Sequence, residues 1–180
     1  ESVKNSDLII LCTPLSTYKN ILNKISKHIS PNAIVTDVGS VKSSVVKIFS
    51  KFKNNKYHII PAHPIAGTEK SGPEAGFADL FNKRWCVLTP MGNNNKKSLN
   101  ILKKMWVSFG SKIQIMNPEN HDKILSITSH MPHLISYSIV ASALNVNSKE
   151  KSHIIKFSAG GFRDFTRIAA SDAVMWKDIF

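Results

Sequence analysis

A stretch rich in glycine, proline and polar side chains is the part of this sequence best suited to chemistry. It reads HPIAGTEKSGPEAG from His63 to Gly76 and holds three of the chain's eight glycines. Glycine and proline at this density indicate a loop with special backbone dihedral angles. The apolar run before it, 57–60, is typical of a buried strand, so we expect His63 where that strand ends and the loop begins. Ligands of open α/β sheets bind at the carboxyl ends of strands, which favours a functional site here. A surface loop with a solvated histidine is the equally open alternative.

Two further turns directly follow apolar runs of strand length. They are Thr13-Pro14, after 8–12, and Gly39-Ser40, after 33–38. In a doubly wound sheet such strand ends form the floor under a bound dinucleotide. Two ordinary strand-to-helix turns are the alternative. Because no Gly-x-Gly-x-x-Gly pattern occurs, we expect either that the chain binds no dinucleotide or that the first strand and its loop lie upstream of Glu1.

Polar side chains also recur at three- and four-residue spacing in the otherwise apolar segment 121–144. They are Ser126, Ser129, His130, His133 and Tyr137. This spacing places them on one face of a helix. Pro132 removes a backbone donor and is expected to kink that helix. Core histidines satisfied by neighbouring hydroxyls are the alternative, but two histidines beside a kink favour a binding surface. No cysteine or acidic partner has suitable spacing, so we predict no metal site.

Arginine is concentrated near the end of the chain, although lysine far outnumbers it elsewhere. Two of the three arginines, Arg163 and Arg167, lie four residues apart in the segment GGFRDFTRIAASD, 160–172. The rigid guanidinium fork suits carboxylates and phosphates better than an ammonium group does. The local excess therefore predicts carboxylate recognition. A helix with surface ion pairs, which are worth little, is the alternative.

Apolar runs of strand length alternate with stretches of helical period up to residue 117. The expected strands are 8–12, 33–38, 57–60, 85–88 and 112–116. This alternation predicts an α/β fold with a parallel sheet, and Ser16 is a candidate N-cap of the first helix. From Asn117-Pro118-Glu119 onward only the helical period occurs. We therefore expect an α/β part at 1–117 and an all-helical part at 118–180.

Composition narrows the partners and the compartment. The net charge is +12, but the lysines are spread without a basic run, so we expect no nucleic acid. No apolar run approaches a membrane span, and no signal peptide precedes the first strand, so we expect no membrane. Cys12 and Cys86 both lie in apolar runs, and two buried thiols predict a reducing, cytoplasmic setting. The chain begins in the middle of a domain pattern, so we expect a fragment.

These motifs together resemble the prephenate and arogenate dehydrogenases of tyrosine biosynthesis. The matching pieces are LCTPL at 11–15, DVGSVK at 37–42, HPIAGTEKSGPEAG at 63–76, SHMPH at 129–133 and GGFRDFTRIAASD with Met175-Trp176 at 160–176. They run in family order over nearly the whole chain. The segment 63–85 is most similar to the bacterial cyclohexadienyl or arogenate type.

The resemblance implies a partial Rossmann-type domain, without its glycine-rich loop, followed by a helical domain that forms a homodimer. It also implies oxidative decarboxylation of prephenate or arogenate with NAD or NADP, and tyrosine as a feedback inhibitor. His63 is implied to accept the proton of the 4-hydroxyl group, and Ser40 to bridge His63, nicotinamide and hydroxyl. The implied substrate-binding residues are Arg167 for a carboxylate and Thr68, Glu69, Ser129, His133 and Trp176 along the pocket. The implied cofactor-binding residues are Cys12, Thr13, Pro14, Asp37, Gly39 and Ser40.

Two rival interpretations stay open. One is a non-catalytic remnant of a dinucleotide-binding sheet, kept for dimerisation or amino-acid sensing. The other is a β-hydroxyacid dehydrogenase, a group that relies on a catalytic lysine in its helical domain. The dehydrogenase hypothesis requires that His63 and Arg167, far apart in the chain, face each other across one cleft.

Overall fold

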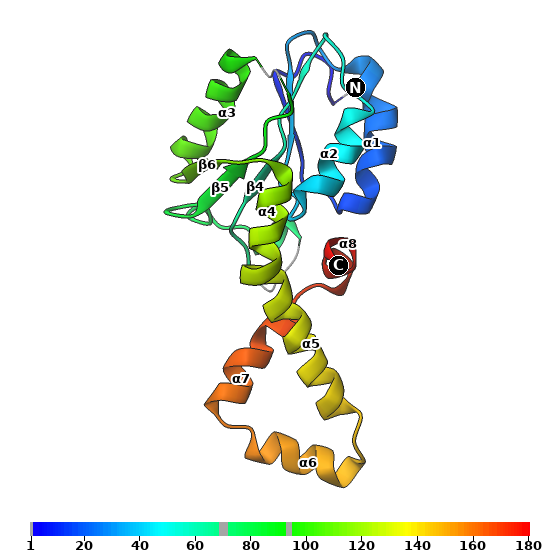
Figure 1. Cartoon of the computed structure of the whole chain (residues 1–180), viewed down its shortest axis with the longest axis vertical. Coiled ribbons are helices and arrows are strands. Elements are labelled where there is room, and N and C mark those ends of the chain that lie inside the picture. Colours follow the sequence, from blue (N-terminus) through cyan, green and yellow to red (C-terminus); the bar gives the residue numbers. More distant parts are fainter. Residues whose placement is uncertain (1, 69–71, 93–94) are drawn as a thin grey trace.

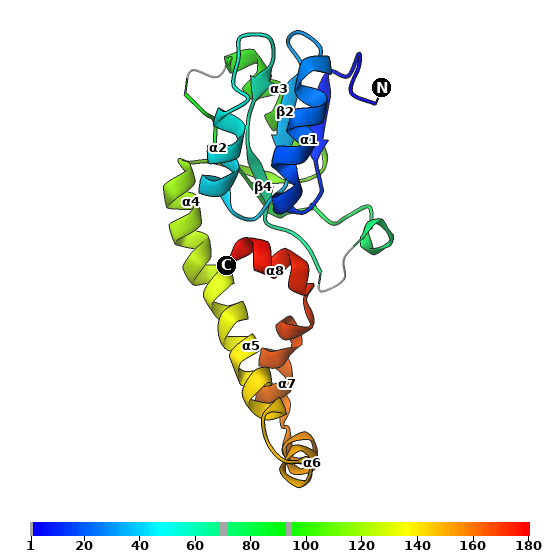
Figure 2. The ribbon, with the colours of Figure 1, turned by 90° about the vertical axis from the view of Figure 1, so that its right-hand side faces the viewer.

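The computed structural model describes residues 2–68, 72–92 and 95–180. It has an α/β part and an elongated helical part below it, and the last helix turns back toward the α/β part (Figures 1 and 2). Helices α1 (Tyr18–Ile25) and α2 (Lys42–Ser50) cover one side of the strands, and α3 (Lys96–Ser108) covers the other. The predicted α/β class with a helical part after it is confirmed.

The first sheet has three parallel strands in the order β1-β2-β3. They are β1 (Leu8–Leu11), β2 (Ile34–Asp37) and β3 (His58–Ile59). Leu8 pairs with Ile34, and Ile34 pairs with His58. The continuous apolar runs form strands because both faces of this sheet are covered. Tyr18 of α1 stacks on Phe49 of α2 in the core beneath it.

The second sheet has the order β4-β5-β6 and differs from the all-parallel expectation. Its strands are β4 (Ala62–Pro64), β5 (Trp85–Leu88) and β6 (Lys112–Ile115). β5 and β6 are parallel, but β4 and β5 are antiparallel. A parallel connection needs a crossover, usually a helix. The described residues between β4 and β5 contain only the short 3-10 turn η3 (Pro73–Ala75), and the chain returns antiparallel.

Three local expectations were wrong. His63 lies inside a separate short strand, β4, where it pairs with Val87, and not in a loop that begins at the end of the strand predicted at 57–60. Ser16 does not cap the first helix: it lies in the 3-10 turn η1 (Leu15–Thr17), and α1 begins at Tyr18. Cys12 is exposed, because β1 ends at Leu11, whereas Cys86 is buried as expected.

The helical part begins at α4 (Pro118–Leu125), whose N-cap Asn117 accepts a hydrogen bond from the amide of Asn120, as its sequence predicts. A π-helical turn, η4 (Ser126–His130), joins α4 to α5 (Met131–Leu144). The helix is thus distorted immediately before Pro132, where a kink was expected. The remaining elements are α6 (Ser148–Phe157), α7 (Gly160–Thr166), the 3-10 turn η5 (Arg167–Ala170) and α8 (Ala173–Ile179).

Hydrogen bonds place the end of the chain over the α/β part. Ser136 donates its hydroxyl to the carbonyl oxygen of Phe165, and Tyr137 donates to that of Ser171, so α5 holds the segment before α8. Asp178 of α8 then accepts from both the amide and the hydroxyl of Ser16, at 2.9 and 2.8 Å. Ser16 therefore anchors α8 beside the end of β1. None of the helices in the described part of the chain is long and apolar enough to cross a membrane.

Candidate active site

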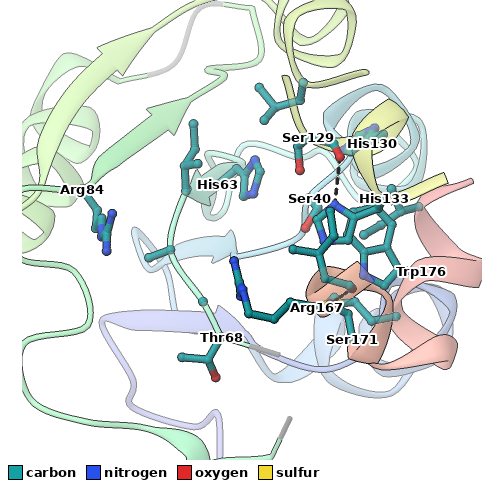
Figure 3. A pocket seen from close by; sticks show the side chains of 17 residues that line it. Ser40, His63, Thr68, Arg84, Ser129, His130, His133, Arg167, Ser171 and Trp176 are labelled. Atoms are coloured by element: carbon teal, nitrogen blue, oxygen red, sulfur yellow. Dashed lines mark hydrogen bonds between the residues drawn. The ribbon is translucent and has the colours of Figure 1, made fainter. Parts of the chain in front are cut away.

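A cavity of about 450 Å³ lies between the α/β part and the helical part (Figure 3). The predicted residues that line it are Ser40, His63, Thr68, Ser129, His133, Arg167 and Trp176. In Figure 3 the guanidinium group of Arg167 and the imidazole ring of His63 point toward the same space. The two residues therefore share one cleft, as the hypothesis requires. Glu69, predicted to bind substrate, lies outside the described residues.

A second cavity, of about 560 Å³, adjoins the first. Of the residues predicted to bind cofactor, Cys12, Thr13, Pro14, Gly39 and Ser40 line it. Ser40, Met175 and Ile179 line both cavities, so the two spaces meet at the end of β2 and under α8. This arrangement agrees with a floor built from strand ends.

Asp37 is the one described member of the predicted cofactor set that lines neither cavity. Its side chain is completely buried and is bonded within the protein. It ends β2 behind the cavity floor. We therefore assign it no contact with a ligand.

A chain of three side chains connects β4 to the start of the helical part. The Nδ1 atom of His63 lies 2.8 Å from Nε2 of His121, and the Nδ1 atom of His121 lies 2.8 Å from Oδ1 of Asp122. His63 is 7% exposed and His121 is completely buried. Sequence reasoning missed both His121 and Asp122. The signal that could have found them is the helix start at Asn117-Pro118, which places this pair in the first turns of α4.

Asp122 also accepts hydrogen bonds from the backbone amides at the N-terminus of α2. Its Oδ1 accepts from the amide of Lys42 at 2.7 Å, and its Oδ2 accepts from the amide of Ser43 at 2.8 Å. Burial alone would raise the pKa of Asp122, but the hydrogen bonds from His121, Ser43 and Lys42 outweigh it and hold that pKa well below its usual value. Asp122 is therefore an anion held at a helix N-terminus, where negative charge is favoured.

This anion fixes where the protons of the two histidines lie. A carboxylate only accepts hydrogen bonds, so in the neutral His121 the proton is on Nδ1 and the Nε2 atom is an acceptor. Nδ1–H of His63 must then donate to that Nε2 atom. The Nε2 atom of His63 is left with its lone pair, which is the form that a base needs.

His63 is held neutral by its surroundings. Burial is the largest cause and lowers the pKa of His63 well below its usual value. The positive charge of Lys42 and the neighbouring His121 and His130 lower it further, and Asp122 opposes them. A buried histidine with a lowered pKa in a cleft is a candidate general base.

The opposite wall of the cavity is aromatic and comes from the helical part. Trp176 stacks on His133 with ring centroids 3.8 Å apart, and Nδ1 of His133 lies 2.9 Å from the carbonyl oxygen of Ser129. The Nε1 atom of Trp176 and the Nε2 atom of His130 are buried and have no partner among the described residues. Buried polar atoms are normally satisfied, so these two nitrogens suit a polar ligand in the cavity.

Arg84 on the cavity wall was not selected from the sequence, whereas His130 belongs to the polar helix face that was predicted as a binding surface. Arg84, just before β5, lines the cavity together with Arg167, so two of the chain's three arginines face one space. His130 lies in the turn η4, beside Trp176. In the described ranges, no three His, Cys, Asp or Glu side chains come together in a way that could hold a metal ion.

Comparisons with known proteins agree over the whole chain. Residues 1–115 match the family model described as prephenate dehydrogenase, nucleotide-binding domain, and residues 117–180 match the one described as prephenate dehydrogenase, dimerization domain. A cyclohexadienyl dehydrogenase of Zymomonas mobilis is 37% identical over 99% of this chain and 61% of its own length. A prephenate dehydrogenase of Bacillus subtilis is 35% identical over 98% of this chain and 48% of its own length.

The solved structures give the same result. The crystal structure of prephenate dehydrogenase from Aquifex aeolicus, in complex with hydroxyphenyl propionate and NAD+, matches with a TM-score of 0.87 and 37% identity. The match covers 97% of this chain and 60% of that one. The chain thus spans from about half to three fifths of the length of these relatives.

Proposed function

The chain belongs to the prephenate dehydrogenase family, and from this premise we propose that it forms part of an NAD- or NADP-dependent enzyme that oxidatively decarboxylates prephenate, arogenate or both. The observation that carries the proposal is the chain from His63 through His121 to Asp122, which ends in a neutral imidazole at the wall of a cavity also lined by Arg167. A scaffold kept only for dimerisation has no need of such a set.

His63 is the general base in this proposal. A hydride leaves the ring carbon that bears the 4-hydroxyl group most readily when negative charge builds on the hydroxyl oxygen. The Nε2 atom of His63 accepts the hydroxyl proton, and the resulting imidazolium is stabilised through His121 by the anionic Asp122. The carbon–carboxylate bond then breaks, CO₂ leaves, and its electron pair completes the aromatic ring, so that the 4-oxygen becomes a phenolate and takes back the proton from His63.

The cofactor would occupy the second cavity. The floor fits the nicotinamide end of a dinucleotide, because Thr13 and Ser40 offer hydroxyl groups there. When bound, the oxidised nicotinamide ring supplies the acceptor for the hydride. Ser40 lines both cavities, so its hydroxyl is placed to bond at the boundary between substrate and cofactor.

The substrate is an anion in either case, and its charge suits this cavity. Arg167 and Arg84 supply fixed cations, and Trp176 with His133 supplies a flat wall for the ring. Positioning the ring and the nicotinamide is the main task left to the protein, since aromatisation drives the reaction.

A homodimer is part of the same proposal. The helical part carries exposed apolar side chains on several helices, among them Leu144, Ile155 (70% exposed) and Phe157 (71% exposed). Exposed apolar patches of this kind mark interaction surfaces. Sedimentation of the purified protein at several concentrations tests this; a monomer at all of them contradicts it.

Assays with both substrates and both cofactors test the activity. The purified protein is expected to reduce NAD+ or NADP+ with prephenate or arogenate and to release CO₂, whereas His63→Asn is expected to bind substrate with little turnover. Binding of the substrates without any turnover by the wild-type protein would favour the non-catalytic alternative instead.

A further inference from the structure

The side chain of Asp37 binds the backbone next to both residues proposed for proton transfer. Its Oδ1 atom accepts from the amide of Ala62 at 3.0 Å, and its Oδ2 atom accepts from the amide of Gly39 at 2.9 Å. Ala62 directly precedes His63, and Gly39 directly precedes Ser40. One carboxylate therefore fixes two separate segments of the cavity wall.

Lys42 completes this contact from the first turn of α2. Its Nζ atom lies 2.6 Å from Oδ2 of Asp37 and donates to the carbonyl oxygen of Ala62, also at 2.6 Å. Both side chains are completely buried. The backbone of Ala62 is thus held on both sides of its Cα atom, because its N–H donates to Asp37 and its C=O accepts from Lys42.

The pair lies where the two sheets separate. Backbone pairing joins β2 to β3 and β4 to β5, and β2 and β4 belong to different sheets. Asp37 at the end of β2 supplies Ala62 of β4 with the acceptor that a neighbouring strand would normally supply. Tyr18 extends the contact to the first strand, because its hydroxyl lies 3.2 Å from the carbonyl oxygen of Leu11 and 3.5 Å from Oδ2 of Asp37.

A buried ion pair of this kind contributes little net stability, because apolar side chains of similar volume often stabilise a fold equally well or better. Its contacts, extended by Tyr18, instead reach the backbone at the end of β1, just after β2 and at the start of β4. In each case a residue that lines one of the cavities follows within one or two positions. We propose that Asp37 and Lys42 form a positioning clamp that holds the segments carrying His63, Ser40 and Thr13 in the register needed for hydride transfer. This inference rests on the proposed dehydrogenase function.

The clamp also brings a positive charge close to His63. The charged and titratable groups that act on His63 are Lys42 from α2, His121 and Asp122 from α4, and His130 from η4. Of these, Lys42 belongs to the clamp, and its charge lowers the pKa of His63. Removing the charge of Lys42 should therefore change the pKa of His63, whereas replacing a residue with a purely structural role should not.

Two variants and one control test the clamp in the complete enzyme. Lys42→Met removes the ammonium group, and Asp37→Asn with Lys42→Met removes both charges and so leaves no unpaired buried ion. Lys47→Met removes an exposed lysine from the same helix. For each protein, kcat and KM are measured, urea unfolding reports stability, and NMR titration gives the pKa of His63.

The clamp predicts that the double variant stays close to wild-type stability but loses about 10²-fold in kcat, the cost of a small misplacement of reacting groups, with KM changed by less than about threefold. It also predicts that the pKa of His63 rises in both Lys42 variants and stays unchanged in Lys47→Met. A folded variant with wild-type kcat, a change confined to KM, or an unchanged pKa of His63 would each overturn the inference.

Amide exchange in the wild-type protein gives a readout that needs neither variant. The amides of Gly39 and Ala62 are expected to exchange as slowly as that of Ile60, which bonds to Val35 in the adjacent ladder. Exchange about 10²-fold faster at either amide contradicts the clamp, even if both variants fail to fold. If the wild-type protein converts no substrate, the proposed function fails, whereas the exchange rates and the pKa of His63 still test the clamp.

Discussion

The Nδ1 atom of His63 and the Nε2 atom of His121 lie 2.8 Å apart, with the two rings edge to face. His63 belongs to β4 of the α/β part, and His121 belongs to α4 of the helical part. The proposed base is therefore oriented from across the junction of the two parts. Asp122 ties the same junction to the N-terminus of α2, so the proton positions and the placement of the helical part depend on one set of bonds.

Asp122→Asn is expected to lower kcat with little change in KM. The asparagine amide can donate to Nδ1 of His121, which moves the His121 proton to Nε2 and forces His63 to carry its own proton on the nitrogen that faces the cavity. A positioned base contributes about 10²–10⁴ in rate, so the loss in kcat should lie between about tenfold and about 10⁴-fold. Steady-state kinetics measure it, with the exposed Asp79→Asn as the matched control. Unchanged kcat in folded Asp122→Asn would show that catalysis does not use this proton order.

The pH dependence of kcat/KM follows from the lowered pKa of His63. The base must be neutral, and burial, assisted by the charge of Lys42, keeps it neutral well below pH 6.5. We expect kcat/KM to stay constant as the pH falls through about 6.5, the ordinary histidine pKa, and to decrease only at more acidic pH. A decrease centred at or above the ordinary value would show that His63 is not the group that titrates.

Acid is also expected to lower the stability of the fold in two steps. Above about pH 6.5 His63 is neutral in both the folded and the unfolded chain. As the pH falls below that value, only the unfolded chain takes up the proton, and the free energy of unfolding decreases. The decrease ends when the pH falls below the lower pKa of His63 in the folded chain. Asp122 acts in the same direction below about pH 3.9, because its carboxylate is stabilised only in the folded state. Urea unfolding at a series of pH values measures this. His63→Asn should remove the first step; if the step persists unchanged, another histidine causes it.

Arg167→Gln is expected to raise KM far more than it lowers kcat. A hydrogen bond to a charged group contributes about 1.5–3 kcal/mol, which corresponds to about 10–150-fold in affinity. Arg163→Gln is the matched control, because Arg163 lies four residues earlier and does not line the cavity. Kinetics of both variants with each substrate measure the difference. Equal effects of the two substitutions would point to the general loss of positive charge and not to a specific contact.

Short apolar runs bounded by glycine or proline made most of the strands predictable. β5 spans Trp85–Leu88 as expected, and the start of α4 after Asn117 was recognised from its cap and proline. The antiparallel pairing of β4 with β5 was not predictable from such runs, because it depends on the path of the chain between them. Cys12 was misassigned because its apolar neighbours belong to a strand that ends one residue earlier.

The residues that line the cavities were easier to find than those that orient them. Hydroxyl, imidazole and guanidinium groups at strand ends and on one helix face suggest ligand contact from the sequence. By contrast, His63 and His121 are 58 positions apart, and nothing local to either residue indicates their contact. Asp37 and Lys42 are five positions apart, but an acidic and a basic residue around a turn are usually solvated, so their burial depends on the packing of β4 above them.

Gly39→Ala is expected to damage the site from within the fold. A Cβ atom at this position would lie 2.9 Å from Oδ2 of Asp37 and 3.3 Å from the hydroxyl oxygen of Tyr18, both of them held by other bonds. The added methyl group must displace Asp37 or move the turn that carries Ser40, so we expect loss of cofactor affinity and of kcat together with about 1–3 kcal/mol of stability.

Gly161→Ala in α7 is the matched control: no atom lies within 4 Å of the place that its methyl group would take, and alanine favours a helix by up to about 1 kcal/mol over glycine. Urea unfolding should therefore show a lower free energy of unfolding for Gly39→Ala and an equal or higher one for Gly161→Ala. Cofactor titration should show weaker binding by Gly39→Ala. Wild-type affinity and stability in Gly39→Ala would mean that the floor under the second cavity can yield without cost, which contradicts the tight contact between Gly39 and Asp37.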